Sequence, residues 1–178
     1  LIATSSAGIG HIRAAEAIRL SFEELPDSVQ VDYVDLMEMA PRLFKWVYAG
    51  GYELLAGSFP WLWRKVYERS DAKGRNGFVE NKLACLFNRK FRRMALREQY
   101  DAIICPHFLP PEVLDASKKS GQLKSKIFTV VTDFDLHSFW VQSKVDHHFV
   151  AAEVIRGRLE KRTGISREHV DVSGIPIH

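Results

Sequence analysis

The 178-residue sequence predicts an α/β fold built on a doubly wound parallel sheet, and three observations support this prediction. Nearly continuous apolar runs, typical of strands in a sheet covered on both faces, occupy residues 101–106, 126–132 and 145–150. Segments with helical periodicity follow these runs, as in consecutive β-α-β units. The chain also opens with an apolar run, a glycine-containing turn and a helical segment, so the same alternation is present from its first residue.

The opening turn favours binding of a phosphate or diphosphate. Residues 1–3 predict a strand, Gly8 and Gly10 supply the freedom that a tight turn needs, and an amphipathic helix begins near Ile12. Such a unit points backbone N–H groups and a positive helix end toward an anion. The turn lacks the Gly-Lys-Ser/Thr of a Walker loop, and Arg13 replaces the third glycine of the dinucleotide fingerprint.

His11 directly follows the second glycine of this turn. A transferase that deprotonates a hydroxyl next to a diphosphate needs a base at such a place, and a positive helix end favours the neutral imidazole that a base requires. The alternative is a solvent-facing side chain in the first turn of a helix. Spacing alone leaves both interpretations open.

The remaining elements continue the alternation around one long interruption. Val29 opens an apolar and polar alternation that predicts a strand over residues 29–36, after which the strand signal disappears. The interruption predicts helices over residues 42–56, 60–69 and 78–97; beyond it we expect helices over 112–119 and 152–163 and a last strand over 170–173.

Polar side chains follow the predicted strands where ligands bind in parallel sheets. His107 follows the strand at 101–106, and Thr132, Asp133 and His137 follow the strand at 126–132. We therefore expect Asp133 and His137 to lie in the same cleft as His11. A metal held by His11, His107, Asp133 and His137 is conceivable, but no closely spaced ligand pair favours it, and we predict no metal site or cofactor.

The net charge of +3 is unevenly distributed. Residues 36–100 carry 13 basic and 6 acidic side chains, a net of +7, and the rest of the chain carries −4. Aromatic residues interleave with these cations, a pattern typical of an element at the surface of an anionic membrane. The residues that we predict to bind the membrane are Trp46, Trp61, Trp63, Arg64 and Lys65. Alternatively, the aromatic residues belong to the core; nucleic acid is not favoured, because no nucleic-acid motif is present.

Composition and termini predict one domain, residues 1–178, of a longer cytoplasmic protein that lies on the membrane. The two cysteines, Cys85 and Cys105, favour a reducing compartment, and no apolar run is long enough to span a bilayer. The first residues already belong to a strand, and the sequence stops after Gly174 and Pro176, so we expect it to be truncated at both ends.

Four stretches, SSAGIGH, VVTDFDLHSFW, VDHHFVAAEVIRGRLEKRTGI and VSGIPI, together carry a family resemblance. In order and spacing they resemble the N-terminal domain of the monogalactosyldiacylglycerol synthase and processive diacylglycerol glucosyltransferase family, which are GT-B glycosyltransferases. The resemblance implies the Rossmann-like acceptor half of a two-domain enzyme, whose C-terminal half binds the nucleotide of a UDP-sugar. Family members often have three glycines before the histidine, whereas this chain has Ala7-Gly8-Ile9-Gly10, so the sugar stays open.

The resemblance implies a role for each polar residue of the predicted cleft. His11 stands at the position of the family's proposed base, and Asp133 is expected to act with it in catalysis. The positions expected to bind substrate are Ser6, Gly8, Ile9, Gly10, His107, Thr132 and His137. The expected reaction transfers galactose or glucose from a UDP-sugar to diacylglycerol or a related membrane lipid. The alternative function is a nucleotide- or phosphate-binding regulatory module without catalysis, which would tolerate the loss of His11.

Overall fold

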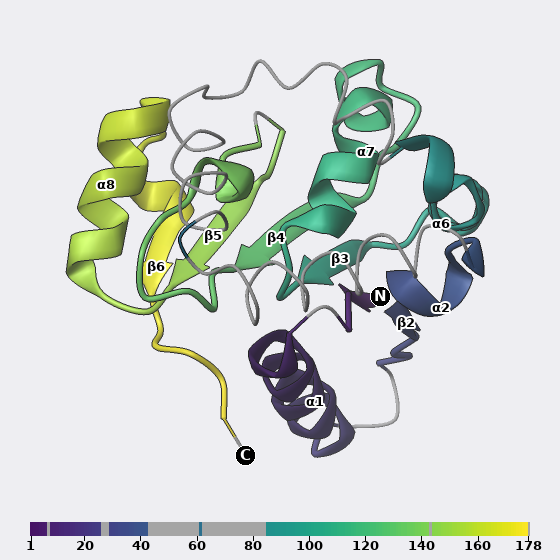
Figure 1. Cartoon of the computed structure of the whole chain (residues 1–178), viewed down its shortest axis with the longest axis horizontal. Coiled ribbons are helices and arrows are strands. Elements are labelled where there is room, and N and C mark those ends of the chain that lie inside the picture. Colours follow the sequence, from purple (N-terminus) through teal and green to yellow (C-terminus); the bar gives the residue numbers. More distant parts are fainter. Residues whose placement is uncertain (7, 26–28, 43–60, 62–84, 143, 178) are drawn as a thin grey trace.

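A six-stranded parallel sheet organises the part of the chain that the structure describes. The computed structural model describes residues 1–6, 8–25, 29–42, 61, 85–142 and 144–177. The sheet has the order β2-β1-β3-β4-β5-β6, and every neighbouring pair is parallel (Figure 1). Its strands are β1 (Ile2–Thr4), β2 (Tyr33–Asp35), β3 (Ala102–Cys105), β4 (Lys126–Val130), β5 (His147–Val150) and β6 (Val170–Val172). The parallel α/β prediction is confirmed.

Helices connect these strands and lie on opposite sides of the sheet. The α-helices are α1 (Ile9–Glu23), α2 (Leu36–Met39), α6 (Arg89–Glu98), α7 (Leu109–Lys119) and α8 (Glu153–Thr163), with 3₁₀ helices η1 (Ser138–Trp140) and η2 (Arg167–His169). The step from β1 to β2 runs opposite to the steps from β3 to β6, so right-handed crossovers place α1 on one face and α7 and α8 on the other. Figure 1 shows α1 apart from α7 and α8, with the strands between them.

The face of the sheet opposite α7 and α8 is well covered at Ile2 and Val130 but less so over the rest of β4 and β5. Ile103, Ile127 and His148 point to one face and are buried, whereas Phe128 and Phe149 point to the other and are half-buried. The sequence predicted full cover of both faces. The difference follows from the crossovers, because every connection from β3 to β6 places its helix on the same face.

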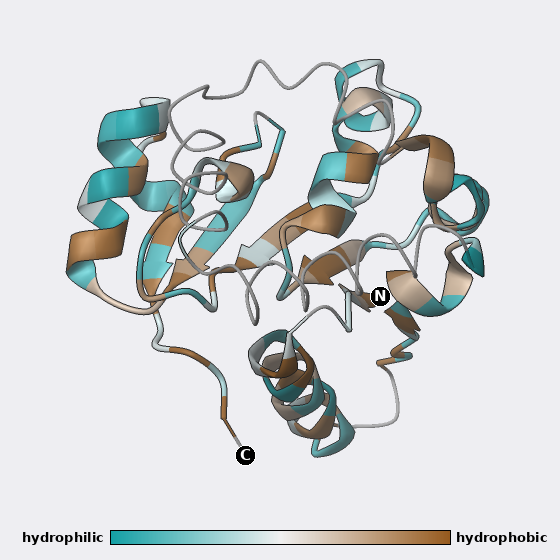
Figure 2. Ribbon diagram, viewed as in Figure 1, coloured by the Kyte–Doolittle hydropathy of each residue, from teal (hydrophilic) through white to brown (hydrophobic). Residues whose placement is uncertain are grey.

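Two clusters of buried side chains form the core on that face. One joins α6 and α7 to the sheet around Phe91, Ile103 and Leu114, and the other joins η1 and α8 to it. The second cluster contains Trp140, which is fully buried. Phe108 packs against both clusters and connects them. Figure 2 shows the corresponding pattern, with hydrophobic residues along β3 and hydrophilic ones over much of α8.

Several predicted boundaries were wrong by a few residues. The strand predicted over 29–36 is limited to Tyr33–Asp35, because the Asp35 side chain ends it by accepting the Met37 N–H at 2.8 Å and starting α2. Helix α7 begins at Leu109, before the predicted 112, since prolines in a first helical turn are tolerated. Helix α1 begins at Ile9. The helices predicted over 42–56 and 60–69 lie outside the described residues, apart from residues 42 and 61.

Candidate functional site

The first turn of α1 places His11 at the carboxyl edge of the sheet. Gly8 precedes the helix with a φ of +123°, which side-chain-bearing residues rarely adopt. A Cβ atom at Gly8 would also lie 3.0 Å from Cδ2 of His11. Glycine at this position therefore allows both the turn and the close approach of the imidazole.

The Nδ1 edge of His11 is held by two groups from other strands. Nδ1 lies 3.1 Å from the carbonyl oxygen of Pro106, which follows β3, and 2.6 Å from Oγ1 of Thr132, which follows β4. A carbonyl oxygen can only accept, so the geometry assigns the proton to Nδ1. The lone pair of the neutral ring is then on Nε2, the atom that is available to take a proton from a substrate.

The charges around His11 suit a base that becomes protonated during a reaction. Burial lowers the pKa of His11, and the charge of Asp133 and the Pro106 carbonyl oppose this effect. The Asp133 carboxylate is fixed by the indole of Trp140, whose Nε1–H donates to Oδ2 at 2.6 Å. A nearby carboxylate stabilises the imidazolium that proton uptake produces.

His107 supports His11 from within the protein. Its ring meets that of His11 edge-to-face with 4.5 Å between centroids, and its side chain is 1% exposed. Nδ1 of His107 accepts the Leu109 N–H at 2.9 Å. Burial, and secondarily the charge of His11, lower the pKa of His107 well below its usual value. His107 therefore remains neutral and orients its neighbour.

His137 lies at the far end of a row of aromatic rings. Its ring is 4.2 Å from that of Phe139, Phe139 stacks on Phe108 at 4.9 Å, and Phe108 adjoins His107 at 4.3 Å. Nδ1 of His137 accepts the Phe139 N–H at 3.2 Å and starts η1. The structure thus joins His137 to His11 through packed rings, while Thr132 joins His11 directly.

The glycine turn leaves backbone donors next to His11. Helix α1 has no side-chain cap and no acidic residue in its first turn. The N–H groups of Ile9 and Gly10 therefore remain suited to an anion.

The two serines before the turn differ from these donors. The Ser6 N–H already has a partner within the protein, because it donates to Oδ1 of Asp35 at 3.0 Å. Ser5 is fully buried, and its hydroxyl has no partner among the described residues.

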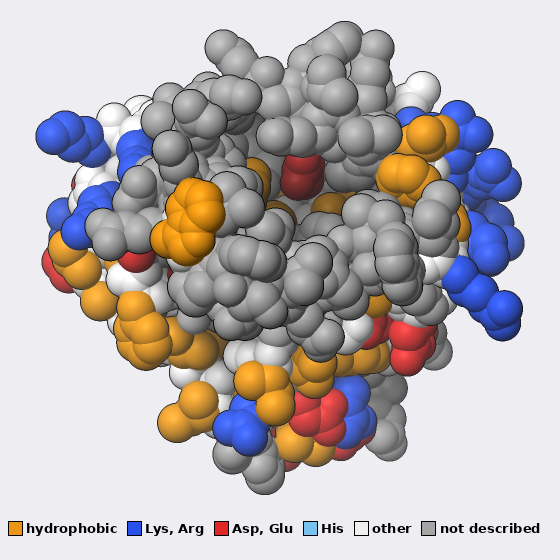
Figure 3. Space-filling view, viewed as in Figure 1, with side chains coloured by type: hydrophobic (Ala, Val, Ile, Leu, Met, Phe, Trp, Pro, Cys, Tyr) orange, Lys and Arg blue, Asp and Glu red, His pale blue; other side chains and the backbone are white. Residues whose placement is uncertain are grey.

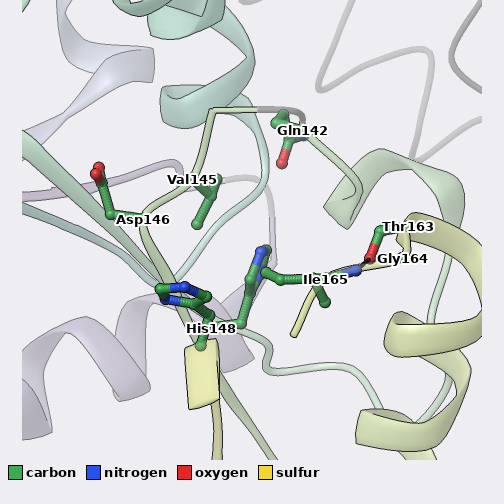
Figure 4. A pocket seen from close by; sticks show the side chains of 8 residues that line it. Gln142, Val145, Asp146, His148, Thr163, Gly164 and Ile165 are labelled. Carbon is green, nitrogen blue, oxygen red and sulfur yellow. Dashed lines mark hydrogen bonds between the residues drawn. The ribbon is translucent and has the colours of Figure 1, made fainter. Parts of the chain in front are cut away.

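A cavity of about 420 Å³ lies at the opposite edge of the sheet (Figure 4). Asp146 lies directly before β5, and residues 163–165 lead from α8 toward β6, so the cavity is at the amino ends of the strands. His148 and His169 also line it. Among the described residues, no three His, Cys, Asp or Glu side chains are grouped so that they could hold a metal ion, here or at His11.

The membrane-binding prediction falls mostly on residues that the structure does not describe. Trp61 is described and is 66% exposed. Trp46, Trp63, Arg64 and Lys65 lie outside the described residues. No helix in the described segments combines the length and the apolar character needed to cross a bilayer.

Comparison with known proteins places the chain in a family. Residues 11–177 match the family model of monogalactosyldiacylglycerol (MGDG) synthase. The chain belongs to the MGDG synthase family. Among curated proteins, the processive diacylglycerol beta-glucosyltransferases of Bacillus cytotoxicus and Bacillus cereus are each 25% identical to this chain. Each alignment covers 99% of this chain and 44% of the relative, so the chain spans less than half of the length of these proteins.

Three groups that help to form the site were not among the site residues predicted from the sequence. They are the Pro106 carbonyl, the Trp140 indole and the Asp35 carboxylate. Asp35 had a usable signal in the sequence, because it lies near the end of the strand predicted over residues 29–36. No such signal existed for Trp140, whose bond to Asp133 depends on how the intervening loop turns.

Proposed function

We propose that this chain is the acceptor half of a glycosyltransferase that moves a hexose from a UDP-sugar to diacylglycerol or a related membrane lipid. The observation that carries the proposal is the fixed orientation of His11, whose Nδ1 is bonded to Pro106 and Thr132 so that Nε2 is left as the base. The names of the Bacillus relatives support the class of acceptor and the type of transfer.

This arrangement supports the following reaction. The acceptor hydroxyl attacks the anomeric carbon of the donor, its proton passes to Nε2 of His11, and the bond from that carbon to the diphosphate breaks. The charge of Asp133 stabilises the resulting imidazolium. The N–H groups of Ile9 and Gly10 stabilise the departing diphosphate together with groups from a nucleotide-binding domain outside this chain.

The enzyme would work on the surface of an anionic membrane, because its acceptor stays in the bilayer. Helix α6 presents four exposed cations, and Figure 3 shows Lys and Arg side chains gathered along the edge where Figure 1 places this helix. The exposed cations are Arg89, Lys90, Arg93 and Arg97. Cations near an anionic leaflet contribute about 1 kcal/mol each, and the exposed Trp61 supplies an apolar contact.

A transfer assay on the full-length protein tests the proposed reaction. UDP-glucose and UDP-galactose are offered separately with diacylglycerol, and the products are identified by mass spectrometry. We expect a hexosyl-diacylglycerol from one of the donors and no product from residues 1–178 alone. Binding of UDP-sugar without transfer to any lipid would favour the regulatory-module alternative.

Vesicle sedimentation tests the membrane contact. The full-length protein should sediment with vesicles that contain anionic lipid, bind neutral vesicles less, and be partly released by salt, which screens exposed charges. Trp61→Ala should weaken the fraction that resists salt. Circular dichroism checks that the variant is folded, and a folded protein that ignores anionic vesicles would contradict the membrane proposal.

A further inference from the structure

Two large apolar side chains are exposed next to His11, one on the first residue of α1 and one on the loop after β4. Phe134 is 87% exposed and Ile9 is 69% exposed. Ile9 begins α1, directly after Gly8 and two residues before His11, and Phe134 lies two residues after Thr132. Because Oγ1 of Thr132 is 2.6 Å from Nδ1 of His11, the two segments meet at the imidazole. Each exposed side chain therefore lies within two residues of a group that forms the site.

The loop that carries Phe134 is anchored on each side of it. Asp133 accepts the Trp140 indole N–H at 2.6 Å, and the Asp135 carboxylate accepts the Leu136 N–H at 2.7 Å and pairs with Arg158. Leu136 itself is 1% exposed. The backbone around Phe134 is thus fixed while its ring stays in water, an arrangement that the fold alone does not require.

We infer that Phe134 and Ile9 bind the acyl chains of the lipid acceptor close to its glycerol group. The inference rests on the proposed function. Pro106 and Thr132 close the Nδ1 edge of His11, so an acceptor hydroxyl approaches Nε2, which lies toward Gly8. The acyl chains of a diacylglycerol begin a few bonds from that hydroxyl and therefore leave the site close to Nε2, and these two exposed side chains are near enough in the chain to meet them.

A series of acceptors tests this contact on the full-length enzyme. Diacylglycerols with acyl chains of two, four and six carbons are used below the concentration at which they aggregate, so no bilayer is present. Each methylene that becomes buried raises kcat/KM roughly fourfold in the wild type. Phe134→Ala should weaken this dependence and lower kcat/KM for the six-carbon acceptor about tenfold. The change should appear in KM, because the contact exists before and during the reaction.

Matched variants separate the contact from general damage. Phe134→Leu should keep most of the dependence on chain length. Ile9→Ala should lower kcat/KM for the six-carbon acceptor about threefold. Leu25→Ala is the control, because Leu25 is 47% exposed beyond the other end of α1, roughly 20 Å away along the helix axis. It should behave as the wild type does.

The outcomes distinguish the inference from the proposed function. A Phe134→Ala enzyme that keeps the wild-type dependence on chain length overturns the inference. So does a variant that loses activity only toward acceptors in vesicles, since the bilayer surface rather than the acceptor would then be the partner of Phe134. A wild-type enzyme that transfers no hexose to any of these acceptors refutes the proposed function itself.

Discussion

Two threonine-histidine pairs have the same hydrogen-bond distance, and their threonines lie three residues apart, in β4 and just after it. Oγ1 of Thr129 is 2.6 Å from Nδ1 of His148, and Oγ1 of Thr132 is 2.6 Å from Nδ1 of His11. Burial and the neighbouring His147 and His169 lower the pKa of His148 to about 4. Burial also lowers the pKa of His11, but the neighbouring Asp133 opposes it. Burial is the main cause in both cases, and the neighbouring charges add to its effect at His148 but oppose it at His11.

The carboxylates near the two pairs differ in the same way. Asp146, beside the cavity that His148 lines, accepts the Ile127 N–H at 2.7 Å and pairs with Lys118 at 3.0 Å. Its charge is therefore largely balanced. Asp133 is bonded to the neutral indole of Trp140, so its charge remains effective at His11. One edge of the sheet carries a structural histidine, and the other carries a histidine suited to catalysis.

The largest expected effect is on turnover. His11→Ala in the full-length enzyme should lower kcat by about 10²- to 10⁴-fold, the range typical of a lost general base. His148→Gln, which keeps a polar partner for Thr129, should retain transfer per folded molecule. Steady-state assays of both variants test the comparison. Equal losses in the two variants would mean that the two pairs do not differ in function.

The second effect is on stability and concerns His148. Its pKa of about 4 lies below the value of about 6.5 expected in the unfolded chain, so the unfolded state binds more protons between these values. The free energy of unfolding should therefore fall as the pH is lowered from 6.5 toward 4, with His148 contributing on the order of 2 to 3 kcal/mol. Urea unfolding at pH 7 and pH 4.5 measures this loss.

The same titration with His148→Gln isolates the contribution of that residue. The variant should show a smaller loss between the two pH values than the wild type, because its side chain does not titrate. His107 and His11, whose pKa values are also lowered, account for part of the remaining loss. An unchanged pH dependence would show that His148 is not the buried neutral group that the structure describes.

The sequence predicted the residues at the carboxyl ends of the strands better than the pair formed by Thr129 and His148. The positions of His11, Thr132 and Asp133 after strand ends could be predicted, because parallel strands bring their carboxyl ends to one edge. The pairing of Thr129 with His148 could not, since both lie inside strands that the sequence showed only as apolar runs. His148 is buried, and no pattern in the sequence distinguished it from its neighbour His147, which is half-buried.

Hydrogen bonds that depend on the conformation of loops also could not be predicted from the sequence. The orientation of His11 depends on the Pro106 carbonyl, and the position of Asp133 depends on Trp140. Backbone carbonyls carry no sequence signal, and the bond from Trp140 requires the turn of residues 134–139 to be known. The bounds of α8 were predicted to within one residue, whereas prolines concealed the start of α7.

A third effect tests the close approach of His11 to Gly8, which has no counterpart at His148. Gly8→Ala should lower the free energy of unfolding by about 1 to 3 kcal/mol, because alanine at a φ of +123° is strained and its Cβ would lie 3.0 Å from His11. Gly10→Ala is the matched control. A Cβ there meets nothing within 4 Å, and alanine in a helix should stabilise by up to about 1 kcal/mol.

Chemical unfolding of both glycine variants checks the direction of each change. Gly8→Ala and Gly10→Ala alter the same turn by one methyl group, so a difference between them reports the backbone and the imidazole rather than general sensitivity of the turn. If Gly10→Ala proved the more damaging, the close approach of His11 to Gly8 would not limit the site.

The smallest expected effect is that of Asp133→Asn. It sharpens the comparison most, because this substitution removes one charge and changes the size of the side chain little. Asp133→Asn keeps an oxygen that can accept the Trp140 indole N–H and removes the negative charge. Because that charge raises the pKa of His11 against the effect of burial, its removal should lower the pKa further.

The wild-type acid limb of kcat/KM should lie below pH 6.5, and the Asp133→Asn limb should lie at still lower pH. At pH 8, where His11 is neutral in both enzymes, kcat should fall about fivefold, which corresponds to roughly 1 kcal/mol of lost stabilisation of the imidazolium. Rate profiles from pH 5 to 9 for both enzymes measure the two changes together. A limb that moves to higher pH, or one that does not move while kcat falls, would mean that Asp133 acts on the substrate rather than on His11.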